Sequence, residues 1–150
     1  MSLFFPDLNV WLALTDAGHV HSGDAWRWLE LLPKGRKLLF SRYTQIGLLR
    51  LLTSTAVMAG QTLTLGEAWR TYDRWLEDPR VSYYPEPRHL EAAFRQATEP
   101  LAAQRASKAI GDCFLLASAG ELRAILVTFD RALHALARAR GQAAVLPLSA

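Results

Sequence analysis

The clearest element of the chain is the stretch Ala124-Ile125-Leu126-Val127-Thr128-Phe129-Asp130. Its first four residues are apolar, which is typical of a strand buried on both faces of a sheet. Thr128 and Asp130 bound this run, and residues 132–140 continue with helical periodicity until Gly141 stops the helix. A buried strand followed directly by a helix is the repeating unit of an α/β fold with a parallel sheet.

The same alternation of short apolar runs and helical patterns continues through the rest of the chain. Ser22 is the expected N-cap of one helix, and Thr64 with Glu67 forms a capping box at the start of another. We therefore predict an α/β fold with a parallel sheet, helices on both faces, and a site at the carboxyl ends of the strands. The other predicted strands are residues 3–5, 38–40, 81–84 and 144–146, and the other predicted helices are residues 9–14, 25–32, 44–52, 68–76, 90–96 and 110–119.

Composition narrows the class of protein. The chain has 150 residues, 51% of them apolar and 21% charged, with a net charge of +3, which predicts one folded domain over residues 1–150. The single cysteine, Cys113, excludes a disulfide scaffold and is expected to be a small core residue. The longest uncharged run, residues 51–66, is too short and too rich in threonine for a membrane span, and the N-terminus lacks the basic region of a signal peptide. We expect a cytoplasmic protein.

Three aspartates fall where this fold places its functional site. Asp7 closes the first strand, Asp130 follows the strand at 124–127, and Asp112 is the only charge between Lys108 and Glu121. Asp7 or Asp112 could simply cap a helix. The convergence of all three at one sheet edge, however, predicts a site for a hard cation, Mg²⁺ or Mn²⁺, because carboxylates are the ligands that such ions prefer.

Other chemistries lack their motifs. His19 and His21 have neither the partners nor the spacing of a zinc site. We find no glycine-rich phosphate loop and no Gly-x-Ser-x-Gly elbow. A phosphotransfer domain or a phosphatase with a strand-end aspartate is a weak alternative, because Asp7 is followed by Leu8-Asn9 rather than by a second aspartate, and Lys108 does not follow a strand.

Three segments taken in order resemble one known family. Residues 5–12 (Phe-Pro-Asp-Leu-Asn-Val-Trp-Leu), 110–117 (Ile-Gly-Asp-Cys-Phe-Leu-Leu-Ala) and 126–130 (Leu-Val-Thr-Phe-Asp) resemble the PIN domain, specifically the VapC-type ribonuclease toxins of prokaryotic toxin–antitoxin pairs. The resemblance implies a three-layer α/β/α fold that cleaves RNA with Mg²⁺ or Mn²⁺. It also implies that Asp7, Asp112 and Asp130 take the metal-site positions and Thr128 the nearby hydroxyl position, which together form the expected catalytic set.

The chain departs from the family pattern at two places. Gly47 stands where the family usually has a glutamate, and Arg131-Ala132-Leu133 follows Asp130 where another acid is common. Fewer carboxylates favour one metal ion assisted by the oxygens of the RNA phosphate over a two-metal site. Gln45 or Arg50 could reach the cleft, Arg50 either as a phosphate contact or as an ion pair with a site acid. The departure also leaves open an alternative, a PIN-like module that binds RNA or protein without cleaving.

Basic residues predict a path for RNA. Beyond Glu121 the only acid is Asp130, whereas Arg131 and Arg138 flank the helix that follows it. Arginine suits phosphate because its guanidinium pairs with it bidentately, so we predict RNA contacts at Arg131, Arg138 and Arg50. The alternative is a solvated helix face with arginines near its C-terminus. A tRNA, an rRNA loop and an mRNA all remain possible targets.

Protein partners are expected as well. The resemblance implies a homodimer and an apolar groove that receives an antitoxin helix. Aromatic residues could supply such a surface, although each alone is more commonly part of a core. They are Trp26, Trp28, Tyr43, Trp69, Tyr72 and Trp75.

Overall fold

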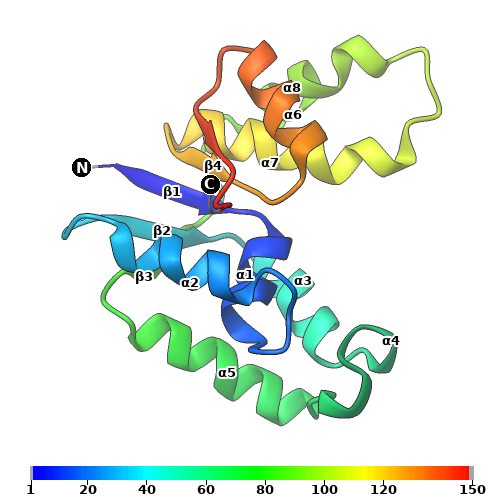
Figure 1. Cartoon of the computed structure of the whole chain (residues 1–150). Coiled ribbons are helices and arrows are strands. Elements are labelled where there is room, and N and C mark those ends of the chain that lie inside the picture. Colours follow the sequence, from blue (N-terminus) through cyan, green and yellow to red (C-terminus); the bar gives the residue numbers. More distant parts are fainter. Residues whose placement is uncertain (1, 149–150) are drawn as a thin grey trace.

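A five-stranded sheet forms the centre of the computed structural model, which describes residues 2–148 (Figure 1). Its order is β3-β2-β1-β4-β5, and every neighbouring pair is parallel. The predicted parallel α/β sheet is thus confirmed. The strands are β1 (Leu3–Pro6), β2 (Lys37–Phe40), β3 (Val81–Tyr83), β4 (Ile125–Val127) and β5 (Ala144–Val145).

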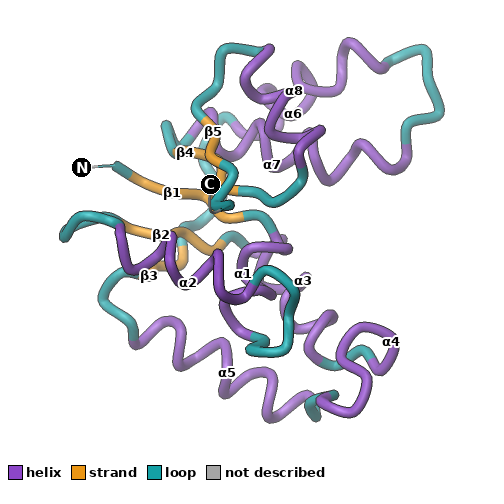
Figure 2. Tube along the Cα trace, in the orientation of Figure 1, coloured by secondary structure: helices purple, strands orange, loops and turns teal. Residues whose placement is uncertain are grey.

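Helices cover both faces of this sheet (Figure 2). Helices α1 to α5 lie on one side and α6 to α8 on the other, so the expected three-layer α/β/α arrangement is confirmed. The helices are α1 (Leu8–Thr15), α2 (Ser22–Leu31), α3 (Arg42–Leu52), α4 (Thr55–Met58), α5 (Leu65–Glu77), α6 (Leu90–Thr98), α7 (Ile110–Glu121) and α8 (Arg131–Ala139), with short 3₁₀ segments at Ala59–Gln61, Glu99–Leu101 and Ser107–Ala109.

The sheet separates two hydrophobic cores. Phe4 points into the core beneath α1, α2, α3 and α5, whereas Phe5 points into the core beneath α7 and α8. Successive residues of a strand point to opposite faces, so a strand covered on both sides must be apolar throughout. In the larger core the Trp11 ring stacks on Phe40 with centroids 3.7 Å apart.

The direction in which strands are added to the sheet reverses at β1. From β1 the chain proceeds to β2 and β3 on one side, and then crosses to β4 and β5 on the other. Ligands in parallel α/β sheets bind at such a reversal, outside the carboxyl ends of the strands. The Asp7 amide donates to the Val127 carbonyl at 2.8 Å, which joins the ends of β1 and β4 at this point.

Most predicted elements match the structure, but the predicted N-cap at Ser22 was wrong, and the alternative that Asp112 caps a helix does not hold. Helix α2 begins at Ser22, so His21 occupies the N-cap position without a side-chain hydrogen bond. Asp112 lies inside the first turn of α7, whose N-cap is Ala109. The Thr64–Glu67 capping box is confirmed, and Asp7 does cap α1. Within residues 2–148, no helix is both long and apolar enough to cross a membrane.

Candidate functional site at the ends of β1 and β4

Asp7 is fixed by hydrogen bonds at both of its carboxylate oxygens. Oδ1 accepts from the Leu8 amide at 2.6 Å, and Oδ2 accepts from the Thr128 hydroxyl at 2.7 Å. Burial raises the pKa of the Asp7 carboxyl, these hydrogen bonds oppose the rise, and the nearby Asp112 and Asp130 raise it further. The structure therefore holds a carboxylate in a partly buried position close to two other acids.

Thr128 organises the connection between the two strand ends. It is fully buried, and its hydroxyl also accepts from the Asp130 amide at 3.0 Å. The Asn9 amide group donates to the same hydroxyl at 3.3 Å, and Asn9 Oδ1 accepts from the Phe129 amide at 3.1 Å. This network gives Thr128 a positioning role. It includes Asn9, which sequence analysis missed although Asn9 is the one polar residue within residues 8–14.

Asp130 lies on the surface at the start of α8. It is the N-cap of that helix, and its Oδ1 accepts from the amides of Ala132 and Leu133 at 2.9 and 3.1 Å. Its position is therefore set by the helix that it caps. The cap was not predicted from the sequence.

Asp112 approaches from the other layer, in the first turn of α7. Burial raises the pKa of this carboxyl, and the charge of Asp130 adds to the rise. Its carboxylate forms no hydrogen bond within residues 2–148. The structure thus brings Asp7, Asp112 and Asp130 into electrostatic contact from three elements.

Tyr43 on α3 borders these acids, whereas the sequence analysis considered it only as part of a surface for protein partners. Burial raises the pKa of its phenol, and the charges of Asp7 and Asp112 raise it further. A Cβ added at Gly111 would collide with the Tyr43 hydroxyl, so this glycine leaves the space in which the phenol lies beside the first turn of α7.

The donor set suits a hard cation, but it is not a closed cage. Among the described residues, no three His, Cys, Asp or Glu side chains form a group ready to hold a metal ion. Mg²⁺ does not require one, because it keeps several waters and commonly binds through one or two carboxylates together with substrate phosphates. A cation would also relieve the repulsion among Asp7, Asp112 and Asp130.

The space beside Gly47 is already occupied. A Cβ added there would lie 2.5 Å from both Leu8 methyl carbons. Leu8 directly follows Asp7, so an apolar side chain fills the space that a side chain at position 47 would need. The missing acid is therefore a feature of the packing between α1 and α3.

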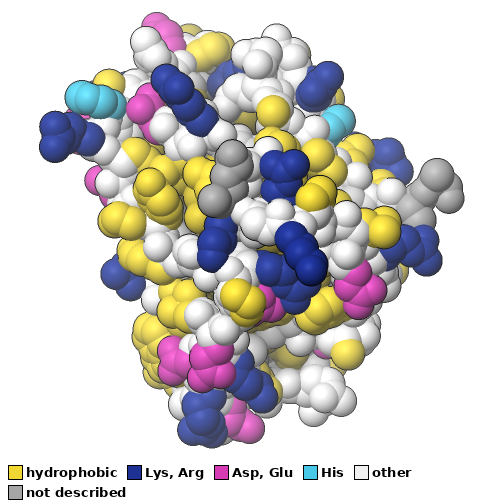
Figure 3. All heavy atoms as spheres, turned by 90° about the vertical axis from the view of Figure 1, so that its left-hand side faces the viewer, with side chains coloured by type: hydrophobic (Ala, Val, Ile, Leu, Met, Phe, Trp, Pro, Cys, Tyr) yellow, Lys and Arg dark blue, Asp and Glu magenta, His cyan; other side chains and the backbone are white. Residues whose placement is uncertain are grey.

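The predicted nucleic-acid contacts lie at different places. Arg131 is the first residue of α8, next to Asp130, whereas Arg138 lies in the last turn of the same helix. Arg50 is exposed in the last turn of α3. Gln45 is buried and accepts a hydrogen bond from Arg42 at 2.6 Å, so it is held within the packing of α3. Lys and Arg side chains are also spread over the face at the amino ends of the strands (Figure 3).

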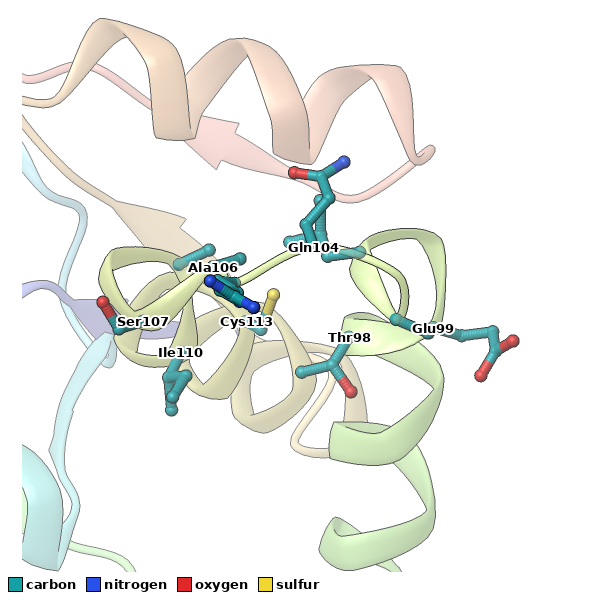
Figure 4. Close-up of a pocket in the computed structure, with 11 residues that line it drawn as sticks. Thr98, Glu99, Gln104, Ala106, Ser107, Ile110 and Cys113 are labelled. Atoms are coloured by element: carbon teal, nitrogen blue, oxygen red, sulfur yellow. The ribbon is translucent and has the colours of Figure 1, made fainter.

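A larger hollow lies between the end of α6 and the start of α7. It measures about 520 Å³ and is formed by residues 98–109 together with the start of α7. Cys113 faces it (Figure 4), but this side chain is only 1% exposed and donates to the Ala97 carbonyl at 3.4 Å. Cys113 is thus a core residue, as expected, and the hollow has no cluster of acids.

Comparison with known proteins identifies what the chain is similar to. The model of the PIN domain family matches residues 4–139. Ribonuclease VapC41 of Mycobacterium tuberculosis, from strains CDC 1551 / Oshkosh and ATCC 25618 / H37Rv, is 41% identical over 93 residues, which is 59% of this chain and 64% of the relative. The match thus spans less than two thirds of these relatives.

Solved structures share the fold at low sequence identity. VapBC-1 from nontypeable Haemophilus influenzae has a TM-score of 0.68 at 16% identity, covering 97% of this chain and 98% of that chain. Mycobacterium tuberculosis VapC20, described as a Sarcin-Ricin loop cleaving toxin, has a TM-score of 0.63 at 20% identity, covering 89% and 94%.

Proposed function

The chain belongs to the PIN domain family, and on that basis we propose that it is a metal-dependent endoribonuclease and the toxin of a toxin–antitoxin pair. One observation carries the proposal. Asp7, Asp112 and Asp130 share an electrostatic environment at the strand reversal where α/β folds bind ligands. The similarity to Ribonuclease VapC41 supports RNA as the substrate.

The three aspartates are the residues that would hold Mg²⁺ or Mn²⁺. Such an ion lowers the pKa of a bound water and stabilises negative charge on the scissile phosphate. Thr128 and the Leu8 amide orient Asp7, and the cap of α8 orients Asp130. With Gly47 in place of an acid, one ion together with the oxygens of the phosphate is the favoured arrangement. The products are a 5′-phosphate and a 3′-hydroxyl.

Cleavage of end-labelled RNA by the purified full chain tests this function. We expect cleavage with Mg²⁺ or Mn²⁺, none with a chelator, and a loss on the order of 100-fold in Asp7→Asn. Asp73→Asn, which removes one exposed carboxylate from α5, is the matched control and should keep full activity. Equal cleavage by Asp7→Asn and the wild type would contradict the proposal.

A non-catalytic module is the second candidate, and a specific observation favours it. Leu8 fills the space beside Gly47, so the chain cannot recruit the extra acid without repacking. If the chain is such a module, the wild type and Asp7→Asn bind RNA with the same salt dependence. Neither of them yields cleavage products with Mg²⁺ or Mn²⁺.

Protein partners form part of the proposal. Leu65, Trp69 and Leu76 on α5 are 59%, 42% and 39% exposed, and their spacing of four and seven residues places them on one helix face. Such an exposed apolar face supports a homodimer that also binds an antitoxin peptide. Tyr72 and Trp75 belong to the core instead, at 3% and 9% exposed.

Sedimentation tests the partner proposal. A dimer at micromolar concentration that dissociates in Trp69→Glu supports it. A wild-type monomer contradicts it.

A further inference from the structure

A small hollow lies at the carboxyl ends of β2 and β3, between α3, α6 and α7. It measures about 150 Å³. Its lining includes five aromatic rings, one arginine, one glutamate and two serines, and we call it the aromatic pocket. The residues on which the argument depends are Arg42, Tyr43, Tyr83, Tyr84, Phe114 and Ser118, and Phe5, Ser41 and Glu86 line the hollow beside them.

The rings of the aromatic pocket offer surfaces for a flat ligand. Tyr43 and Tyr84 are 37% and 43% exposed. Tyr43 lies 4.8 Å from Phe114 between ring centroids, at an interplanar angle of 45°, so these two rings pack against each other and a ligand can meet only their outer faces. The Arg42 guanidinium lies 5.0 Å from the centre of the Tyr83 ring. Aromatic rings and arginine planes are the groups on which unstacked nucleobases stack.

Ser118 gives the pocket a polar group that lacks a partner. Its side chain is buried at 2% exposure, and its Oγ forms no hydrogen bond within residues 2–148. A buried hydroxyl without a partner costs about 1–3 kcal/mol, so such groups are uncommon and require an explanation. The Oγ is closed to solvent, so a ligand that displaces the side chains covering it would provide the missing hydrogen bond.

The pocket adjoins two of the three carboxylates, Asp7 and Asp112. Tyr43 is the shared wall, because it lines the pocket and also interacts with Asp7 and Asp112. Phe114 lies two residues after Asp112 on α7, and Phe5, another lining residue, lies two residues before Asp7 on β1. A nucleotide whose phosphate lies at the carboxylates therefore has its base, or that of its neighbour, within reach of the pocket.

We propose that the aromatic pocket receives a pyrimidine base of the RNA beside the bond that is cleaved. This inference rests on the proposed ribonuclease function and adds the base that the site selects. A cavity of about 150 Å³ can enclose a single six-membered ring such as benzene, whereas a purine carries a second fused ring. The Ser118 hydroxyl both donates and accepts, so it can pair with the polar edge of cytosine or of uracil.

Nucleoside binding without metal tests the pocket separately from cleavage. Cytidine, uridine, adenosine and guanosine are titrated into the metal-free full chain, and NMR follows the ring signals of Tyr83 and Tyr84. We expect the pyrimidine nucleosides to shift these signals at lower concentration than the purine nucleosides. Equal response to all four, or no response, would overturn the proposal.

Two substitutions of Ser118 separate binding from packing. Ser118→Ala should weaken pyrimidine binding about five- to tenfold, while the melting temperature stays equal or rises because an unpartnered hydroxyl has been removed. Ser118→Val should fill the pocket and abolish binding. Ser107→Ala, at an exposed serine of the larger hollow, is the control and should bind as the wild type does. Unchanged binding in both Ser118 variants would overturn the proposal.

RNA oligomers with a single pyrimidine in a purine background complete the test. Cleavage next to the pyrimidine in the wild type, with loss of that preference in Ser118→Val, supports the proposal. Cleavage without base preference would contradict the proposal that the pocket binds a pyrimidine, but it would agree with the ribonuclease function. Pyrimidine binding without any cleavage would support the pocket as a binding site for the base and would contradict the ribonuclease function. Equal binding of cytidine and deoxycytidine is a further outcome, as is cleavage of DNA as well as RNA. Both results together would show that the pocket binds pyrimidines of either nucleic acid, which contradicts the proposal that it receives a base of RNA in particular.

Discussion

At the scale of single residues, Asp7 shows how the candidate site costs the folded protein stability. Its carboxylate is partly buried beside Asp112 and Asp130, and burial followed by these like charges raises its pKa. A carboxyl whose pKa is raised in the folded state destabilises the fold when ionised, and the penalty disappears as pH falls through that pKa towards the unfolded value. The metal-free protein therefore keeps an unfavourable charge that a bound cation would neutralise.

Asp7→Asn is accordingly expected to stabilise the metal-free protein while removing activity. Asparagine can still accept from the Leu8 amide and cap α1, but its amide nitrogen cannot accept from the Thr128 hydroxyl, so the change removes the charge and one hydrogen bond. We expect the free energy of unfolding to rise by about 1 kcal/mol at neutral pH, and the gap from the wild type to narrow towards pH 4. Mg²⁺ should raise the melting temperature of the wild type more than that of the variant. Denaturation with and without Mg²⁺ measures both effects, and Asp73→Asn should show neither.

The sequence predicted these residues to different degrees. Asp7, Asp130 and Thr128 follow buried strands. The ends of such strands can be predicted from the sequence because the apolar runs stop there. The roles of Tyr43 and Asn9 could not be predicted from the local sequence, because they depend on residues in and after α7 and β4 that are distant along the chain. The pairing of Leu8 with Gly47 is likewise visible only once α1 and α3 are packed together.

At the scale of elements, α8 joins the site to the fold through Asp130, whose Oδ1 caps the helix. Asp130→Ala and Asp130→Asn separate the two roles. Loss of the cap in Asp130→Ala should cost about 1 kcal/mol, whereas Asp130→Asn keeps the cap at nearly full stability. Both variants lose the carboxylate, so both should lose RNA cleavage. Wild-type activity in Asp130→Asn would show that Asp130 serves the helix alone.

The contact between α1 and α3 gives a second prediction at this scale. Gly47→Glu places a Cβ 2.5 Å from the methyl carbons of Leu8, so Leu8 must move. We expect a loss of about 1–3 kcal/mol, and a smaller loss when Leu8→Ala is added. A double-mutant cycle by chemical denaturation measures this coupling. Additive effects of the two changes would contradict the packing seen here, and tighter Mn²⁺ binding by the double variant would indicate that the new acid reaches the site.

Element boundaries were predicted less well than element types. Ser22 was predicted as an N-cap because serine favours that position. In the structure Ser22 is instead the first residue of α2, and His21 occupies the N-cap position. The His21 ring stacks on Phe129 with centroids 4.4 Å apart, a contact from beyond β4 that no local pattern contains. The short helix α4 and the 3₁₀ segments were missed because they span only three or four residues.

At the scale of the whole molecule, the two arginines of α8 lie at opposite ends of that helix. Arg131 lies at the amino end of α8, where the helix dipole favours anions, so a cation there is better placed for a phosphate than for the fold. Arg138 lies seven residues further on, about 10 Å along the helix, where the dipole itself favours a cation. The two arginines that looked equivalent in the sequence therefore have different surroundings.

RNA binding should separate these two arginines. Arg131→Ala is expected to weaken RNA affinity and to reduce the slope of log affinity against log salt by about one unit, because one phosphate contact is lost. Arg138→Ala should change neither quantity by as much, since Arg138 is placed to interact with the helix terminus. Titrations of the catalytically silent Asp7→Asn background at several salt concentrations measure both without cleavage. Equal losses in the two variants would mean that RNA runs along the whole of α8, and unchanged binding in both would direct the search to Arg50 on α3, because it is exposed in the last turn of that helix.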